Sequence, residues 1–165
     1  MIKPKRELTP AQLANMIDKI SKCEDSQLLR QWIDNAKKRG QSKIEEAAFF
    51  RLVEISPADE NGPLGADMWK SIHALELALS LERNHTTRLA RTRQKIARVG
   101  MQQTLADLAL APKASDGFSM LMSRNMPELT AEAVILRHKD CFSDSVIAAA
   151  EARLHDAGVD EADCL

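Results

Sequence analysis

The chain of 165 residues has no Tyr, only 4% aromatic residues, 6 Gly and 6 Pro. With so few aromatic rings, its core has to be built from Leu, Ile, Ala and Met. Runs of Val, Ile or Thr that alternate with polar residues are also few, which argues against a sheet, and the scarcity of Gly and Pro favours helices. We therefore predict an all-α fold, a bundle of about seven or eight helices.

The chain has three cysteines, an odd number, and they are far apart in the sequence: Cys23, Cys141 and Cys164. This pattern argues against a disulfide framework and favours a reducing, cytoplasmic location. No CxxC motif is present, and His138 with Cys141 is the one closely spaced pair of metal-ligating residues. We thus expect neither a metal site nor a cofactor.

Long apolar runs are absent as well. No stretch reaches membrane-spanning length, and no apolar segment follows the basic residues Lys3, Lys5 and Arg6, so we expect neither a membrane anchor nor a secretory signal. The chain also lacks a nucleophile elbow and a Gly-rich phosphate loop. A non-enzymatic protein is favoured, and a catalytic site assembled from distant residues stays open.

Start and stop signals predict three helices in the first part of the chain. Thr9 and Gln12 have the spacing of a capping box at the start of the first helix. The second helix ends at Gly40, which can adopt the left-handed conformation of a C-terminal cap. Ser42 with Glu45 predicts a second capping box, which begins the third helix.

Three parts follow from these signals: an N-terminal helical unit over residues 1–58, a C-terminal helical bundle over residues 66–157 and an acidic tail over residues 158–165. Pro and Gly between positions 57 and 65 predict the break between the first two parts. The helix after the break is apolar on two sides, which is typical of a central helix. We expect the acidic tail to be frayed.

One stretch of the chain has no carboxylate. Between Glu82 and Asp107 all charged residues are Lys or Arg, although the net charge of the whole chain is only -1. Asn84 or Thr86 is placed to cap a helix in this stretch, and Gly100 is placed to end it. Helical periodicity puts Leu89, Thr92, Ile96 and Val99 on one face and Arg88, Arg91, Lys95 and Arg98 on the neighbouring face.

Two functions fit this basic face. The leading hypothesis is a non-enzymatic nucleic-acid-binding protein that contacts the phosphate backbone through Arg88, Arg91, Arg93, Lys95 and Arg98, assisted by the arm that carries Lys3, Lys5 and Arg6. The alternative is a helical adaptor or homo-oligomer that docks the same face on an acidic protein surface. A third interpretation is a solvated face whose cations pair with carboxylates of neighbouring helices.

Two further patterns are given a structural interpretation. Lys37, Lys38 and Arg39 lie in the last turn of the second helix, where cations interact favourably with the helix dipole, so we prefer that role to a binding role. A helix-turn-helix motif around Gly100 is only weakly indicated, because Ile96 stands where that motif needs a small residue.

Overall fold

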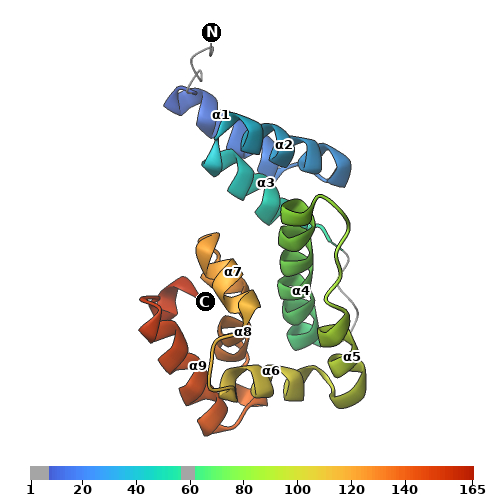
Figure 1. Cartoon of the computed structure of the whole chain (residues 1–165). Coiled ribbons are helices and arrows are strands. Elements are labelled where there is room, and N and C mark those ends of the chain that lie inside the picture. Colours follow the sequence, from blue (N-terminus) through green and yellow to red (C-terminus); the bar gives the residue numbers. More distant parts are fainter. Residues whose placement is uncertain (1–7, 57–61) are drawn as a thin grey trace. The chain divides into compact units, whose positions relative to one another are not determined.

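The computed structural model describes residues 8–56 and 62–165, and every regular element in those ranges is a helix. Nine α-helices and three short 3-10 helices are found there, with no strand in the described part of the chain (Figure 1). The predicted all-α class and the helical bundle are confirmed, while the predicted number of helices was slightly too low.

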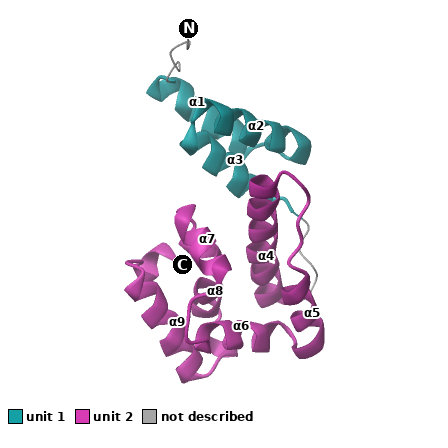
Figure 2. Ribbon diagram, in the orientation of Figure 1, with its two compact units in different colours: residues 1–57 teal, residues 58–165 magenta. Residues whose placement is uncertain are grey.

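The chain divides into two compact units, which we name unit 1 (residues 1–57) and unit 2 (residues 58–165) (Figure 2). Unit 1 contains α1 (Pro10–Ser21), α2 (Ser26–Arg39) and α3 (Ser42–Glu54). Helix α3 packs against both α1 and α2. The core of unit 1 consists of Ile20, Leu29, Ile33, Ala36, Ile44, Ala48, Phe49, Leu52 and Val53.

The helix ends of unit 1 test the predicted caps. Thr9 and Gln12 form the predicted capping box, and Gly40 ends α2 with a φ of 66° in the left-handed region. The capping box predicted at Ser42 is wrong, because Gln41 occupies the N-cap position of α3 without a side-chain hydrogen bond. The Gly40 turn is so tight that the Gln41 N–H donates to the Ala36 carbonyl at 2.9 Å, which leaves Ser42 already inside the helix.

Unit 2 begins with α4 (Gly62–Arg83) and α5 (Ala90–Val99), which are followed by α6 (Met101–Leu110) and α7 (Asp116–Ser123). The chain then forms α8 (Ala131–Arg137) and α9 (Asp144–Asp156). Helix α8 packs against α4, α6 and α9. Its four consecutive residues 133–136 are at most 3% exposed, so α8 lies in the middle of the core of unit 2.

A buried ion pair fastens α9 to the centre of unit 2. The side chain of Glu132, on α8, is 2% exposed and lies 2.9 Å from Nη1 of Arg153 on α9. Arg153 also donates to the Leu108 carbonyl at 2.8 Å and to the Ala111 carbonyl, both at the end of α6. One guanidinium therefore satisfies a buried carboxylate and two carbonyl groups that a helix end leaves without intrahelical partners.

The acidic tail predicted to be frayed is instead part of unit 2. It forms a 3-10 helix, η3 (Glu161–Asp163), and the Cys164 side chain after it is 1% exposed. Arg137 donates to the Cys164 carbonyl at 2.7 Å, and Lys139 pairs with Glu161 at 2.6 Å. Burial of the Cys164 thiol raises its pKa. These contacts come from α8 and the residues after it, so no local pattern in the tail could have predicted them.

Candidate nucleic-acid interface

The basic stretch between Glu82 and Asp107 begins in a loop that α4 holds in place. Asn84 turns the chain with a φ of 56°, and α5 starts only at Ala90, with Leu89 at its N-cap. The caps predicted at Asn84 or Thr86 are therefore wrong. The Leu89 N–H donates instead to Oε1 of Glu76 at 2.9 Å, so a carboxylate on α4 caps the helix from outside it.

Arg93 is bound by the protein itself. Its Nε and Nη2 donate to the two carboxylate oxygens of Glu76, at 2.7 and 2.8 Å, and its guanidinium lies 4.8 Å from the centre of the Trp69 ring. Burial alone would raise the pKa of Glu76, but hydrogen bonds from Arg93 and from the Leu89 backbone outweigh it and hold this pKa below its usual value. Arg93 thus anchors α5 to α4, and its guanidinium faces Glu76 instead of a ligand.

Lys95 is partly engaged. Its Nζ lies 2.7 Å from Oδ2 of Asp107 on α6, and both side chains are about a third exposed, at 34% and 39%. The hydrogen bond from Lys95, then one from Gln103, lowers the pKa of Asp107, and the charge of Arg98 adds to this effect. Lys95 therefore ties α5 to α6 at the surface and is a weaker candidate for phosphate contact than its position in the sequence implied.

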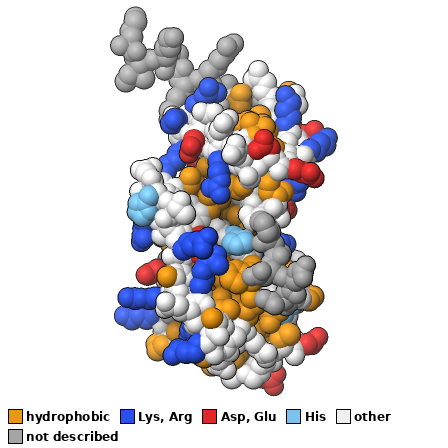
Figure 3. All heavy atoms as spheres, turned by 90° about the vertical axis from the view of Figure 1, so that its right-hand side faces the viewer, with side chains coloured by type: hydrophobic (Ala, Val, Ile, Leu, Met, Phe, Trp, Pro, Cys, Tyr) orange, Lys and Arg blue, Asp and Glu red, His pale blue; other side chains and the backbone are white. Residues whose placement is uncertain are grey.

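Three of the five predicted contacts remain available to a ligand. Arg88, Arg91 and Arg98 are exposed, and none has an ion-pair partner within the described residues. Arg91 and Arg98 are two turns apart on one side of α5, which separates their Cα atoms by about 10 Å. Figure 3 views the side of Figure 1 that carries α5 and shows Lys and Arg side chains beside hydrophobic and acidic ones. We name these three residues the arginine row.

The remaining predicted contacts, Lys3, Lys5 and Arg6, lie outside the described residues. The structure therefore places one of the five predicted helix contacts against α4, one against α6, and three in the arginine row. No residue of α5 is fully buried, although Leu89 and Ile96 pack against the core of unit 2. Charge pairs and these two half-buried side chains therefore hold α5 on the unit.

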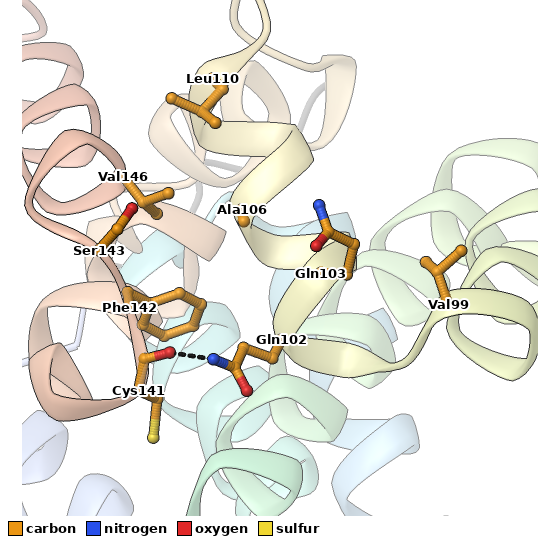
Figure 4. A pocket seen from close by; sticks show the side chains of 9 residues that line it. All are labelled: Val99, Gln102, Gln103, Ala106, Leu110, Cys141, Phe142, Ser143 and Val146. Carbon is orange, nitrogen blue, oxygen red and sulfur yellow. Dashed lines mark hydrogen bonds between the residues drawn. The ribbon is translucent and has the colours of Figure 1, made fainter.

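A shallow groove lies next to the end of the arginine row. Its volume is about 600 Å³, and it is formed by the end of α5, the outer side of α6 and the segment that begins α9. The side chains that line it are Val99, Gln102, Gln103, Ala106, Leu110, Cys141, Phe142, Ser143 and Val146 (Figure 4). The Gln102 side-chain amide donates to the Cys141 carbonyl across it.

The groove presents apolar side chains to solvent. Leu110 is 53% exposed and Val99 is 40% exposed, and in the close view the Phe142 ring lies beside the Gln102 amide, across from Val99 (Figure 4). Sequence reasoning missed this groove, because its walls come from segments about forty residues apart and no motif marks either one. A ligand bound to Arg98 could place an apolar or aromatic group against this groove.

His138 and Cys141, the pair considered as metal ligands, do not form a shared site. Nε2 of His138 lies 2.8 Å from Oδ2 of Asp67, which also accepts from Arg137 at 2.9 Å. Burial would raise the pKa of Asp67, but the hydrogen bonds from Arg137 and His138 outweigh it and lower this pKa. Within residues 8–56 and 62–165, no three His, Cys, Asp or Glu side chains are grouped to hold a metal ion.

Comparisons of the chain with protein-family models, with curated proteins and with solved structures find no match. In the described part of the chain, no helix combines the length and the apolar character needed to cross a bilayer. Any function assigned to this chain has to be inferred from its own residues.

Proposed function

We propose that this protein binds nucleic acid by contacting the phosphate backbone with the arginine row. The observation that carries the proposal is the exposure of Arg88, Arg91 and Arg98 with no ion pair in the described residues, next to two cations that do form ion pairs. Guanidinium groups bind phosphate through paired N–H donors, and they stay charged at any physiological pH.

The attachment of α5 supports this role. Arg93 and Lys95 fix the helix from two sides, so Arg91 and Arg98 are presented on a support that needs no rearrangement on binding. Backbone contacts of this kind carry little sequence information, and they fit a chain whose net charge is only -1 because a local patch suffices. We place this activity in the cytoplasm, since the three cysteines are free thiols.

Salt dependence tests the proposal directly. Three neutralised phosphates predict a slope of log affinity against log salt of about -2.7 on duplex DNA and about -2.1 on a single strand. The R88A/R91A/R98A variant should lose nearly all binding. Fluorescence anisotropy of a labelled oligonucleotide measures both quantities.

A matched control removes the same charge elsewhere. The K37A/K38A/R39A variant deletes three exposed cations of unit 1, and it should bind nucleic acid with the slope of the unchanged protein. Absence of binding at low salt, or an equal loss in both triple variants, contradicts the assignment to the arginine row.

The groove beside Arg98 favours a second candidate function, docking of an acidic protein surface. Exposed Val99 and Leu110 would be covered by a protein partner or a second copy of the chain, whereas a phosphate backbone offers nothing apolar to cover them. A Leu110→Ser variant separates the two functions. It should leave oligonucleotide affinity unchanged, and under the second candidate it should abolish a concentration-dependent dimer measured by light scattering.

A further inference from the structure

The groove beside the arginine row is lined by aromatic and polar side chains that contacts to a phosphate backbone do not use. The Phe142 ring is half-buried against the core of unit 2, and the exposed side chains of Gln102 and Gln103 line the groove from α6. In the close view Ala106 lies between Phe142 and Gln103, and its small side chain leaves space between them (Figure 4). We name these four side chains the Phe142 seat.

The two amides of the Phe142 seat keep hydrogen-bonding capacity for a ligand. The Gln102 NH₂ group donates to the Cys141 carbonyl, and the Gln103 NH₂ group donates to Oδ1 of Asp107 at 2.7 Å. Each of these bonds uses one N–H, so the second N–H and Oε1 of both amides have no partner within the described part of the chain. The edge of any nucleobase offers acceptors or donors that match them.

Arg98 brings a phosphate-binding group to the α5 end of the groove. It directly precedes Val99, which lines the groove, and its side chain is exposed. The charge of Arg98 also reaches Asp107, whose pKa is lowered first by the hydrogen bond from Lys95 and in smaller part by Arg98. Because Asp107 accepts from Gln103 as well, Arg98 and the Phe142 seat meet at the same part of α6.

We propose that the Phe142 seat binds an unpaired base of a single-stranded nucleic acid whose backbone is held by Arg98. This inference rests on the proposed function and names the form of nucleic acid that the chain prefers. Bases of a single strand stack on aromatic rings whatever their sequence, whereas a duplex keeps its bases paired and stacked inside. Preference for a single strand therefore follows from the ring, and low sequence specificity is retained.

The lining favours a base over an apolar side chain of a protein partner. An aliphatic group would cover the Phe142 ring but leave the amides of Gln102 and Gln103 covered and incompletely paired, which costs free energy. A base covers the ring with its face and pairs the amides with its edge. Leu110 lies two turns beyond Gln103 along α6, so a single base in the Phe142 seat leaves it uncovered.

Three labelled ligands test the seat by fluorescence anisotropy at low salt: a single strand of about eight nucleotides, the same backbone without bases, and a hairpin duplex. The single strand should bind the unchanged protein about tenfold more tightly than the strand without bases, since stacking of one base on a ring has about that effect. Phe142→Leu should remove this advantage and leave the other two affinities unchanged. Phe142→Tyr keeps an aromatic ring and should preserve it.

Controls separate the ring from the arginine row and from the fold. Arg98→Ala should weaken binding of all three ligands, because each has a phosphate backbone. Leu110→Ser changes an exposed lining residue outside the Phe142 seat, and it should leave all three affinities unchanged. Circular dichroism and urea unfolding check that Phe142→Leu is folded under the conditions of the titration. If it is not, the comparison of single strands with and without bases on the unchanged protein and on Phe142→Tyr decides.

Two results overturn the proposal. One is equal affinity of the unchanged protein for the single strands with and without bases. The other is a folded Phe142→Leu variant that still prefers the strand with bases, or that loses affinity equally for all three ligands. Salt-dependent binding that R88A/R91A/R98A abolishes would survive either result, so the proposed function would stand without the Phe142 seat. No binding of any of the three ligands would overturn both.

Discussion

Helices α8 and α5 of unit 2 are both short, yet they are held in opposite ways. Five of the seven residues of α8 are buried, and its one fully buried charge, Glu132, is paired with Arg153. None of the ten residues of α5 is buried, and carboxylates on α4 and α6 bind two of its cations. Apolar burial hardly responds to salt, whereas a partly exposed ion pair such as Lys95–Asp107 does, so salt or acid should loosen α5 before α8.

The largest expected effect is the loss of stability on removing the buried ion pair in the core of unit 2. Arg153→Ala leaves the buried Glu132 side chain without its ion-pair partner, and should lower the free energy of unfolding by about 3–5 kcal/mol. Urea denaturation measures this change. Lys70→Ala, an exposed change on α4, should cost less than about 0.5 kcal/mol. A cost below 1 kcal/mol for Arg153→Ala would contradict the buried pair.

The next largest effect should come from weakening the attachment of α5 to α4. Glu76→Gln removes the charge that Arg93 binds at two oxygens, and should weaken the attachment of α5 by about 1.5–3 kcal/mol. Hydrogen exchange should quicken at residues 85–99 and stay unchanged in α8. Equal acceleration in both helices would show that α5 belongs to the same cooperative unit as the core.

A fall in pH should also loosen α5 before α8. The pKa values of Glu76 and Asp107 are lowered in the folded chain, from ordinary values of 4.5 and 3.8. A lowered carboxyl pKa contributes stability that is present above the ordinary value and is lost as the pH falls through the lowered one. Acid also weakens the contact between Asp67 and Arg137 of α8, but the buried residues of α8 still hold that helix. Below pH 4.5, α5 should therefore lose exchange protection before α8 does, after correction for intrinsic exchange rates. Simultaneous loss would contradict the assignment of these carboxylates as the anchors of α5.

The smallest effect on stability belongs to the arginine row. Because Arg88, Arg91 and Arg98 have no ion-pair partner within the described residues, each of the changes R88A, R91A and R98A should alter the free energy of unfolding by no more than about 0.5 kcal/mol. Thermal and urea unfolding measure it. A larger loss would mean that these side chains support the fold, and it would undermine their assignment to a ligand.

Local signals in the sequence predicted the elements whose causes are local. Thr9 caps a helix with its own side chain, and Gly40 ends one with positive φ, so a few neighbouring residues determine each outcome. The start of α5 depends on Glu76, thirteen residues before Leu89, and neither residue type is a usual cap. Capping propensity therefore favoured Asn84 or Thr86 as the N-cap, but the hydrogen bond from Leu89 to Glu76 determines where the helix begins.

The candidate site also depends on tertiary contacts that local sequence signals could not predict. The sequence identified a helix with a basic face, but charge alone could not show that Arg93 meets Glu76 or that Lys95 meets Asp107. Both pairings join different helices and depend on how α4, α5 and α6 pack. The groove beside Phe142 is also a product of packing, since it is lined from three segments of the chain.

The most direct test of the account follows the arginine Nε–H signals by nuclear magnetic resonance while a short oligonucleotide is added. The signals of Arg88, Arg91 and Arg98 should shift together and saturate, and that of Arg93 should stay at its position because Glu76 holds its Nε–H. Shifts at Arg93, or no shift in the arginine row under conditions where the oligonucleotide is bound, would contradict the account.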